Sequence, residues 1–454
     1  MKSNKKYICS NCGAIFAKWQ GKCSNCNQWN TLTEQVEQKS DSRIKTSKTP
    51  GKTTRLSNNL VLKPNIRFPT GSDELDRVLG GGVVNGSVML IGGAPGVGKS
   101  TLLMQVAYTI SNSIGKVLYV SGEESLEQIA LRAKRLKCIS ENIFILPQSR
   151  LDQFIAEIEQ EDFSLVIIDS IQSVYIPEVQ GTVGGVSQVR QSASLLSEIC
   201  KRRNIPLFLI GHITKDGSIA GPKTLEHLVD VVLYFDEDTS SDFRLLKAFK
   251  NRFGIVGEVG VFRMDEKGLL DVENPSQLFL SQSINKESGS AITVGIEGKR
   301  AFLLELQALV SKTGYSYPQR VIRGLNLTRC LLLLAILEKK VGIPMSNYDC
   351  FVNIVGGLKS EDPALDLPFV LAVVSSFRNL RIKDNTLAIG ELGLNGALVS
   401  PSNMDIRLRE IVRTNYNRIL VPSDCKVDKI TGLEIIPVSD LFSAFDLALE
   451  KKDK

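Results

Sequence analysis

Residues 93–100 read GAPGVGKS, which matches the phosphate-binding pattern G-x-x-x-x-G-K-[ST]. The apolar segment SVMLIG precedes the pattern and the helical segment TLLMQVAYTI follows it, so the strand–loop–helix context that the pattern requires is present. In such loops, backbone N–H groups surround the phosphates of a nucleotide, helped by the N-terminus of the following helix. We expect Lys99 to reach the β- and γ-phosphates and Ser100 to coordinate Mg²⁺. The predicted nucleotide-binding residues are Gly93, Ala94, Pro95, Gly96, Val97, Gly98, Lys99, Ser100, Thr101 and Asp169.

Polar residues follow three other apolar segments, where parallel strands of an α/β sheet would bind a ligand. LVIID ends in Asp169, the expected partner of Mg²⁺ directly or through water, although it could instead cap the next helix. KVLYVSGEES delivers Glu123 and Glu124, and a carboxylate there could orient the attacking water or belong to a solvated surface pair. LFLIGH ends at His212, which could sense the γ-phosphate, although single histidines are more often structural.

Two Cys-x-x-Cys pairs lie near the N-terminus, ten residues apart. Two such pairs complete the tetrahedral thiolate coordination of Zn²⁺, and a segment this small needs metal binding for its folding energy. The aromatic residues around the pairs could stack on nucleic-acid bases or form only the small core of the module. The predicted zinc ligands are Cys9, Cys12, Cys23 and Cys26.

The chain divides into four parts by composition. Residues 1–33 hold the cysteine cluster, and residues 34–64 are polar and basic, typical of a flexible linker. From 65 to 280, β-branched runs alternate with helical patterns, which predicts a parallel α/β sheet covered by helices on both faces. Residues 288–454 begin a second pattern, with a leucine-rich helix near 326–340, and predict a separate α+β domain.

The formal net charge of +6 is unevenly distributed. Residues 1–63 contain 12 Lys and Arg residues against three acidic residues, so the rest of the chain carries a net charge of −3. This basic arm indicates an anionic partner such as nucleic acid, or else a solubilising tail. Four of the nine cysteines lie within 9–26, which favours a reducing cytoplasm over a disulfide framework. The longest apolar run, CLLLLAIL, is shorter than the ~18 residues of a membrane span, and we expect no secretory signal and no membrane partner.

Longer motifs occur in a fixed order along nearly the whole chain. They are YICSNCG, WQGKCSNCNQWNT, TGSDELDRVLGGGVVNGSVMLIGGAPGVGKSTLL, LYVSGEES, LVIIDSIQ, GHITKDGSIAGPKTLEHLVD, KNRFG and GGLKSEDPALDLP. In this order they resemble the bacterial RadA (Sms) family of DNA recombination and repair ATPases, which are related to RecA and to DnaB-type helicases. The resemblance implies a RecA-like P-loop ATPase core, an N-terminal four-cysteine zinc finger and a C-terminal α+β domain like the protease domain of Lon. It also implies ATP, Mg²⁺ and Zn²⁺ as cofactors.

The resemblance assigns roles to single residues. Glu123 matches the RecA-like general base, and Asp169 is the carboxylate on the metal side. KNRFG, residues 250–254, is the signature of the family, and its Lys250 and Arg252 match positions implicated in nucleotide-dependent function and DNA engagement. The resemblance further implies a hexameric ring that hydrolyses ATP with DNA, extends heteroduplex by branch migration and works with the RecA recombinase.

KNRFG by itself would be an ordinary hairpin turn. In a ring, the same turn can face the nucleotide of the neighbouring subunit. Lys250 and Arg252 could then supply transition-state charge in trans, as arginine fingers do, with Phe253 as the anchor of the turn and Gly254 permitting it.

The C-terminal domain lacks the catalytic pair of Lon, a serine and a lysine. DPALD places Ala364 at the expected nucleophile position, and GLNGALVSPS contains no lysine. Without a hydroxyl and an ammonium group there is no activated nucleophile, so we expect a scaffold for oligomerisation or DNA contact and not a protease.

Two glycine-rich loops, 175–191 and 214–223, follow inner strands of the predicted sheet. In RecA-like rings, the loops at these positions face the central channel. They offer Arg190, Lys215 and Lys223 to DNA phosphates, unless they are surface loops with ordinary charges. We therefore expect a cytoplasmic ring ATPase that moves single-stranded DNA at branched recombination intermediates. The rivals are a KaiC-like ATPase that acts on protein and a DNA-binding scaffold that nucleotide only controls.

Overall fold

The computed structural model contains two compact units, residues 1–62 and residues 63–454. The structure describes residues 67–212, 225–236, 243–281 and 287–451, and within the first unit residues 5–9, 15–16, 18–24, 28–29 and 32–36.

The N-terminal unit contains a small antiparallel sheet. Its strands are β1 (Lys5–Cys9), β2 (Ile15–Phe16) and β3 (Leu32–Val36), in the order β2-β1-β3. Lys22 and Trp29 form an isolated antiparallel bridge, and the N–H of Cys23 donates to the carbonyl of Gln28 at 2.9 Å. The Cys23 side chain is fully buried.

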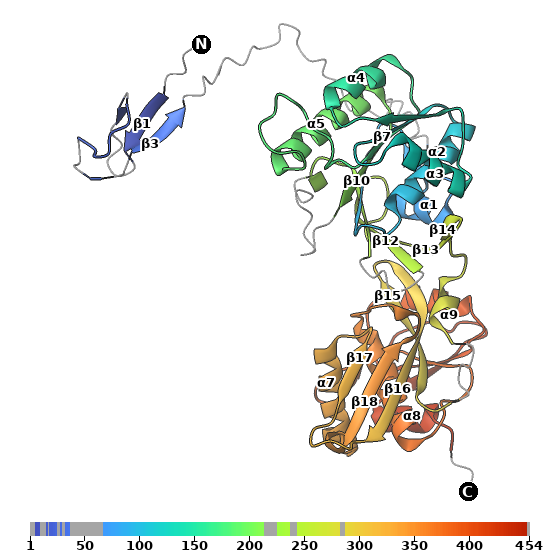
Figure 1. Cartoon of the computed structure of the whole chain (residues 1–454). Helices are drawn as coiled ribbons and strands as arrows, with labels where there is room; N and C mark the ends of the chain where they lie inside the picture. The colour runs from blue at the N-terminus through green and yellow to red at the C-terminus, as the bar shows by residue number, and fades with distance from the viewer. Residues whose placement is uncertain are drawn as a thin grey trace, which may run out of the picture. The chain divides into compact units, whose positions relative to one another are not determined.

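A nine-stranded sheet forms the centre of the first domain of the larger unit (Figure 1). Six neighbouring strands, from β11 to β8 in the order β11-β6-β10-β9-β7-β8, pair in parallel, and the remaining three continue the sheet antiparallel from β11. The strands are β6 (Val88–Gly93), β7 (Val117–Ser121), β8 (Ile143–Pro147), β9 (Leu165–Asp169), β10 (Leu207–His212), β11 (Val231–Phe235), β12 (Phe243–Asn251), β13 (Val259–Asp265) and β14 (Gly268–Asp271).

Helices cover both faces of this sheet. Met89 and Ile91 of β6 belong to a core that includes residues of α1, α2 and α3, whereas Val88 and Leu90 belong to a core with residues of α4 and α5. Alternate side chains of one strand therefore enter opposite cores, as the two-residue repeat of a strand requires. The helices are α1 (Asp73–Leu79), α2 (Lys99–Ser113), α3 (Leu126–Leu136), α4 (Leu151–Gln160) and α5 (Val186–Arg203).

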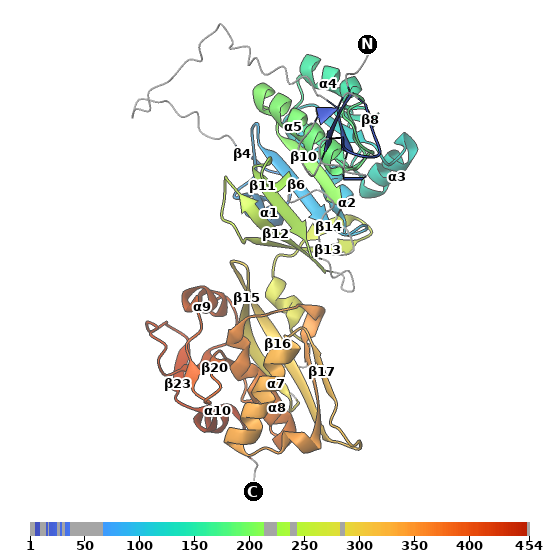
Figure 2. The same ribbon diagram turned by 90° about the vertical axis from the view of Figure 1, so that its left-hand side faces the viewer.

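The second domain is built on a seven-stranded sheet in the order β17-β18-β16-β15-β19-β22-β23 (Figure 2). The strands are β15 (Ser290–Glu297), β16 (Arg300–Lys312), β17 (Arg320–Arg323), β18 (Tyr348–Ile354), β19 (Thr386–Ala388), β22 (Arg418–Pro422) and β23 (Glu434–Val438). The helices are α7 (Leu327–Ile336), α8 (Asp366–Arg378), α9 (Met404–Val412) and α10 (Leu441–Ala448).

Short elements complete the two domains. Two-stranded sheets are formed by β4 (Arg67–Phe68) with β5 (Val83–Val84) and by β20 (Glu391–Leu392) with β21 (Leu398–Val399). The 3-10 turns are Pro275–Phe279, Met345–Asn347, Val355–Gly357 and Pro363–Leu365, and a π-helical turn Leu337–Val341 extends α7.

The parallel α/β sheet with helices on both faces, predicted from the alternating pattern, is confirmed. The strand β8 and the antiparallel extension β12–β14 were not predicted from the sequence, and the extension carries KNRFG. In the described part of the chain, no helix is long and apolar enough to cross a membrane.

Candidate functional site

The phosphate-binding loop connects the buried strand β6 to the start of α2. Gly96 and Gly98 have φ values of 80° and 112°, which side chains other than glycine rarely adopt. A Cβ at Gly98 would lie 2.6 Å from the Met264 side chain, so the start of α2 packs closely on β13. At Gly96, a Cβ would meet nothing within 4 Å among the described residues. The loop therefore keeps an open side where phosphates fit.

Lys99 is folded back onto the loop that carries it. Its ammonium group donates to the carbonyls of Gly93 at 2.8 Å and Ala94 at 3.0 Å, and its side chain is nearly buried. Burial lowers the pKa of Lys99 to about 8, although the carboxylates of Asp169 and Glu123 oppose this shift. A phosphate would therefore meet a lysine already placed in the loop and partly stripped of water.

Asp169 ends β9 as a nearly buried carboxylate beside the loop. It accepts a hydrogen bond of 2.6 Å from the hydroxyl of Tyr119, a fully buried residue of β7. Burial raises the pKa of Tyr119, and the charge of Asp169 raises it further, so this hydroxyl remains a donor. The nearby side chain of Ser100 opposes this rise in the pKa of Tyr119. Tyr119 thus holds Asp169, one of the two predicted Mg²⁺-side residues, and lies near the other, Ser100.

The two glutamates after β7 have different partners. Glu123 accepts a hydrogen bond from the hydroxyl of Ser170, and its other carboxylate oxygen lies 3.7 Å from Nε2 of His212. Glu124 instead forms an ion pair with Arg132 of α3. Glu123 is therefore the carboxylate that the fold brings to the ends of β9 and β10, and its half-exposed side chain remains accessible to water.

His212, at the end of β10, is held by its backbone. Its carbonyl accepts from the side chain of Gln172 at 3.3 Å, while neither ring nitrogen has a hydrogen-bond partner among the described residues. Burial and the nearby charge of Lys99 lower the pKa of His212, against the carboxylates of Glu123 and Asp169. The imidazole is therefore neutral near pH 7 and can accept or donate one hydrogen bond toward a ligand.

KNRFG lies at the amino ends of the parallel strands, whereas the phosphate loop lies at their carboxyl ends. It ends β12 and begins the hairpin connection of residues 252–258 to β13, so the hairpin prediction is correct. Asn251 pairs with Val231 at the start of β11, and Val231 pairs with Met89 near the start of β6. The phosphate loop follows the other end of β6, and a strand of this length spans roughly 17 Å.

Both cations of KNRFG have partners within the same chain. The ammonium group of Lys250 donates to the carbonyls of Glu226 at 2.6 Å and Val229 at 2.8 Å. Arg252 forms an ion pair of 3.1 Å with the buried carboxylate of Asp230, but more than half of its side chain is exposed. Arg252 is therefore the cation of this turn that remains available to another molecule.

The glycine of KNRFG acts differently from the prediction. Gly254 is not among the glycines with positive φ, but a Cβ there would lie 2.8 Å from the Cα of Gly80, at the end of α1. Glycine is thus required by a close approach of two backbones and not by the turn itself. Phe253 packs partly buried against the core, and its carbonyl accepts from Arg67 at 2.5 Å.

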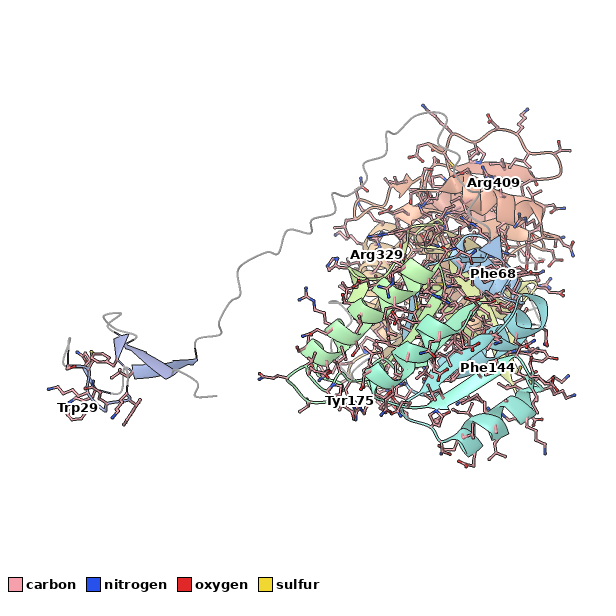
Figure 3. All side chains as sticks on the ribbon, turned by 90° about the horizontal axis from the view of Figure 1, so that it is seen from above. Trp29, Phe68, Phe144, Tyr175, Arg329 and Arg409 are labelled. Carbon is pink, nitrogen blue, oxygen red and sulfur yellow. The ribbon has the colours of Figure 1, made fainter. Side chains whose placement is uncertain are left out.

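The predicted DNA loop 175–191 is wrong in its last six residues. It begins near Tyr175, labelled in Figure 3, but α5 starts at Val186, so Arg190 is an exposed residue of a helix. The buried amide of Gln188 holds the base of the remaining loop, because it bonds both backbone groups of Ile176 and the carbonyl of Val179. Lys215 and Lys223 lie outside the described residues.

Two of the four predicted zinc ligands lie within the described residues. Cys9 ends β1 and Cys23 is buried in the N-terminal unit, whereas Cys12 and Cys26 lie outside the described residues. The buried thiol and the Cys23–Gln28 backbone bond fit a metal-binding turn, and four thiolates would hold Zn²⁺.

Ion pairs lie on both sides of Ala364, the predicted nucleophile position of the Lon-like domain. Ala364 is fully buried in a 3-10 turn. Its flanking residue Asp362 forms two bonds, of 2.7 and 2.9 Å, with the buried guanidinium of Arg407, and Asp366 pairs with Arg329 at 3.1 Å. The acidic residues of DPALD therefore hold the fold together around a position without a hydroxyl.

Replacement of Lys99 allows a test through pH. The charged phosphates raise the pKa of Lys99, so nucleotide binding takes up a proton when the pH exceeds about 8. We expect the affinity for ATP to fall by up to ~tenfold per pH unit above that value, in titrations from about pH 7 to about pH 9.5. Lys99→Arg, which stays protonated, should remove this dependence. Identical pH profiles of the two proteins would contradict the prediction.

Replacement of Tyr119 tests the support of Asp169. Tyr119→Phe removes the hydroxyl that orients this carboxylate, and we expect about tenfold more Mg²⁺ to be needed for half-maximal ATP hydrolysis. Tyr108→Phe, at a half-buried tyrosine of α2, is the control and should leave the Mg²⁺ requirement unchanged. An unchanged requirement in Tyr119→Phe would show that the hydroxyl does not support the metal side.

Three family models match parts of this chain. Residues 65–218 match the family model of the AAA domain, residues 7–34 that of the rubredoxin metal binding domain, and residues 333–425 that of the ChlI subunit of Mg-chelatase. A solved RadB recombinase aligns with 45% of this chain and 99% of its own, at 26% identity and a TM-score of 0.36.

Full-length relatives extend the similarity to the whole chain. The DNA repair protein RadA of Synechocystis sp. is 42% identical over 99% of this chain and 95% of the relative. RadA of Bacillus subtilis is 40% identical over 99% of both chains, and RadA of Helicobacter pylori is 43% identical over 93% of this chain and 94% of the relative. With a RecA-like ATPase domain between a zinc-ribbon domain and a Lon-like domain, the chain belongs to the family of bacterial DNA repair proteins RadA.

Proposed function

We propose that this chain is a DNA-dependent ATPase that promotes branch migration of recombination intermediates, working as a cytoplasmic homo-hexameric ring on single-stranded DNA. A RecA-type recombinase would be its partner, and zinc would hold the N-terminal module together. One observation carries the proposal: the phosphate loop and the exposed cation Arg252 lie at opposite ends of the parallel strands of the same sheet.

This separation favours a ring over a single-subunit enzyme. Arg252 cannot reach the phosphates of its own loop across a strand of roughly 17 Å, since the extended side chain is shorter than that. If subunits stack so that one edge faces the other, each nucleotide is contacted by Lys99 of one subunit and by Arg252 of the next. Heterologous contacts of this kind close into rings when the rotation permits.

Within one subunit, the site separates metal-side and water-side roles. Asp169, which Tyr119 holds, and Ser100 would bind Mg²⁺, which would neutralise charge on the β- and γ-phosphates. Glu123 is held by Ser170 and remains open to water, so it can orient the attacking water and accept its proton. Lys99 exchanges its two carbonyl partners for phosphate oxygens.

The DNA-facing segment begins directly after the catalytic edge. Gln172 lies three residues beyond Asp169 and bonds the backbone of His212, and the loop that follows is held by Gln188 of α5. A change at the γ-phosphate would therefore reach α5 through the backbone from Gln172 to Ile176 and the hydrogen bonds at its two ends. The exposed Arg190 of that helix would contact the DNA backbone without reading sequence.

Mixing of two inactive proteins tests whether Arg252 acts in trans. Lys99→Ala subunits lack a working loop, and Arg252→Ala subunits lack the cation, so each protein alone should lose DNA-stimulated ATP hydrolysis. In equal mixtures about a quarter of the interfaces combine an intact loop with an intact Arg252, and we expect turnover to return to about that fraction. Both variants should keep their zinc and their folded state by circular dichroism. No recovery in subunit-exchanged mixtures would exclude the action in trans.

The salt dependence of binding tests the DNA surface. Arg190→Ala should weaken the binding of single-stranded DNA and lower the slope of log affinity against log salt by about 0.7 for each lost phosphate contact. Fluorescence anisotropy with unrelated sequences should give the same loss. The control is Arg202→Ala on the same helix, because Arg202 pairs with Glu159. Equal slopes in Arg190→Ala and wild type would show that α5 does not contact the DNA.

The effect of DNA on turnover tests the target of the ATPase. An ATPase rate that single-stranded DNA leaves unchanged would favour a protein target.

A further inference from the structure

The connection between β12 and β13 is held from the side of the ATPase domain. This connection, residues 252–258, is called the KNRFG turn below. Its start is fixed by the side chain of Asn251, which donates to the carbonyl of Val78 at 3.0 Å. Gly254 lies against Gly80, and Arg67 donates to the carbonyl of Phe253. The first half of the turn therefore rests on the end of α1.

The second half of the turn rests on the C-terminal domain. The tip of the β15–β16 hairpin, residues 297–300, lies directly against it. The N–H of Lys299 donates to the carbonyl of Gly257 at 2.8 Å. Gly298 has a φ of 61°, and a Cβ there would lie 2.1 Å from the same carbonyl oxygen. The contact is thus backbone against backbone and leaves no room for a side chain.

Two ion-pair sites hold the hairpin tip in place. Arg300 pairs with Glu74 of α1, and both side chains are largely buried. Glu74 also accepts from the N–H of Val261 in β13 at 2.7 Å. On the other strand, Glu297 pairs at 2.8 Å with Lys247 of β12. The tip is therefore fixed to both strands that the KNRFG turn connects.

The hydrogen bonds of the turn connect this contact to the cations. The N–H of Gly257 donates to Ala248 at 2.8 Å, and the N–H of Ala248 donates to Glu258 at 3.0 Å. These two bonds close the hairpin two residues before Lys250. A shift of Gly257 would therefore move the strand end that carries Lys250 and the turn that carries Arg252.

We propose that the hairpin tip of the C-terminal domain positions the KNRFG turn, so that this domain sets the placement of Lys250 and Arg252. Residues 297–300 are positioning residues, since they act through the turn and contact no predicted nucleotide-binding residue. Because β15 and β16 continue into the seven-stranded sheet, a movement of that domain reaches the turn as a movement of a rigid two-stranded ribbon (Figure 2). The effect on turnover rests on the proposed role of Arg252, but the positioning of the turn does not.

The Gly298→Ala variant of the full chain tests the positioning directly. The added methyl group cannot fit against the Gly257 carbonyl, so the tip must separate from the turn. The control is Gly432→Ala, where φ is similarly positive but nothing lies within 4 Å of the added carbon among the described residues. We expect amide hydrogen exchange in residues 252–258 to accelerate about tenfold or more in Gly298→Ala and to stay unchanged in the control. Unchanged exchange in Gly298→Ala would overturn the proposal.

Kinetics then separate the positioning from the role of Arg252. In Gly298→Ala we expect kcat for DNA-stimulated ATP hydrolysis to fall several-fold at an unchanged KM, because the phosphate loop is untouched. In a Lys250→Ala, Arg252→Ala background the same substitution should cause no further loss of the residual turnover, since the hairpin acts through the turn that places these two cations. A full additional loss would show another route and overturn the proposal. Accelerated exchange together with wild-type turnover of Arg252→Ala supports the positioning while refuting the proposed function of that arginine.

A milder variant covers the case in which Gly298→Ala fails to fold. Glu297→Gln keeps the shape of the side chain but removes its charge, and Lys247 keeps Asp236 at 3.2 Å. It should accelerate exchange in residues 252–258 about two- to threefold, which conversion to Glu297→Asp should partly reverse. Exchange as slow as in the wild type would again contradict the proposal.

Discussion

The buried carboxylate of Asp230 connects the start of β6, the helix α5 and the KNRFG turn at the amino ends of the parallel strands. It accepts from the N–H of Val88 at 3.1 Å, pairs with Lys201 of α5 at 2.9 Å and pairs with Arg252 of the KNRFG turn at 3.1 Å. A charge so deeply buried is tolerated only with such partners. Because it fixes the beginning of β6, the helix on one face and the turn at once, it also fixes the distance between Arg252 and the phosphate loop at the far end of β6.

The local parts of the site could be predicted from sequence, and the distant ones could not. The phosphate loop and Asp169 follow from short motifs behind apolar strands, and the structure places both at one edge. Tyr119 was missed because an aromatic residue inside an apolar strand looks like core, and its role depends on a partner 50 positions away. Asp230 was missed because its role also depends on a distant partner, Val88, which lies 142 positions away. Arg190 was placed in a loop because three glycines precede it, but α5 begins after the last of them.

In the C-terminal domain, two ion pairs flank Ala364, the position where the resemblance to Lon places the nucleophile. The family-level fold of this domain was recognisable from DPALD and the leucine-rich helix, whereas the use of the two aspartates was not. Each of them binds an arginine that lies 37 or 45 positions away, and these ion pairs stabilise the fold on both sides of the buried Ala364.

The folded-back position of Lys99 in the phosphate loop has a consequence for ligand selection. Since Lys99 already satisfies two carbonyl groups, a ligand must exchange these bonds and does not simply add to an open charge. A small anion such as chloride or inorganic phosphate offers few contacts in return for the exchange, whereas a triphosphate also engages the open backbone at Gly96 and the start of α2. We therefore expect the loop to favour a triphosphate over simple anions, independently of the base and the sugar.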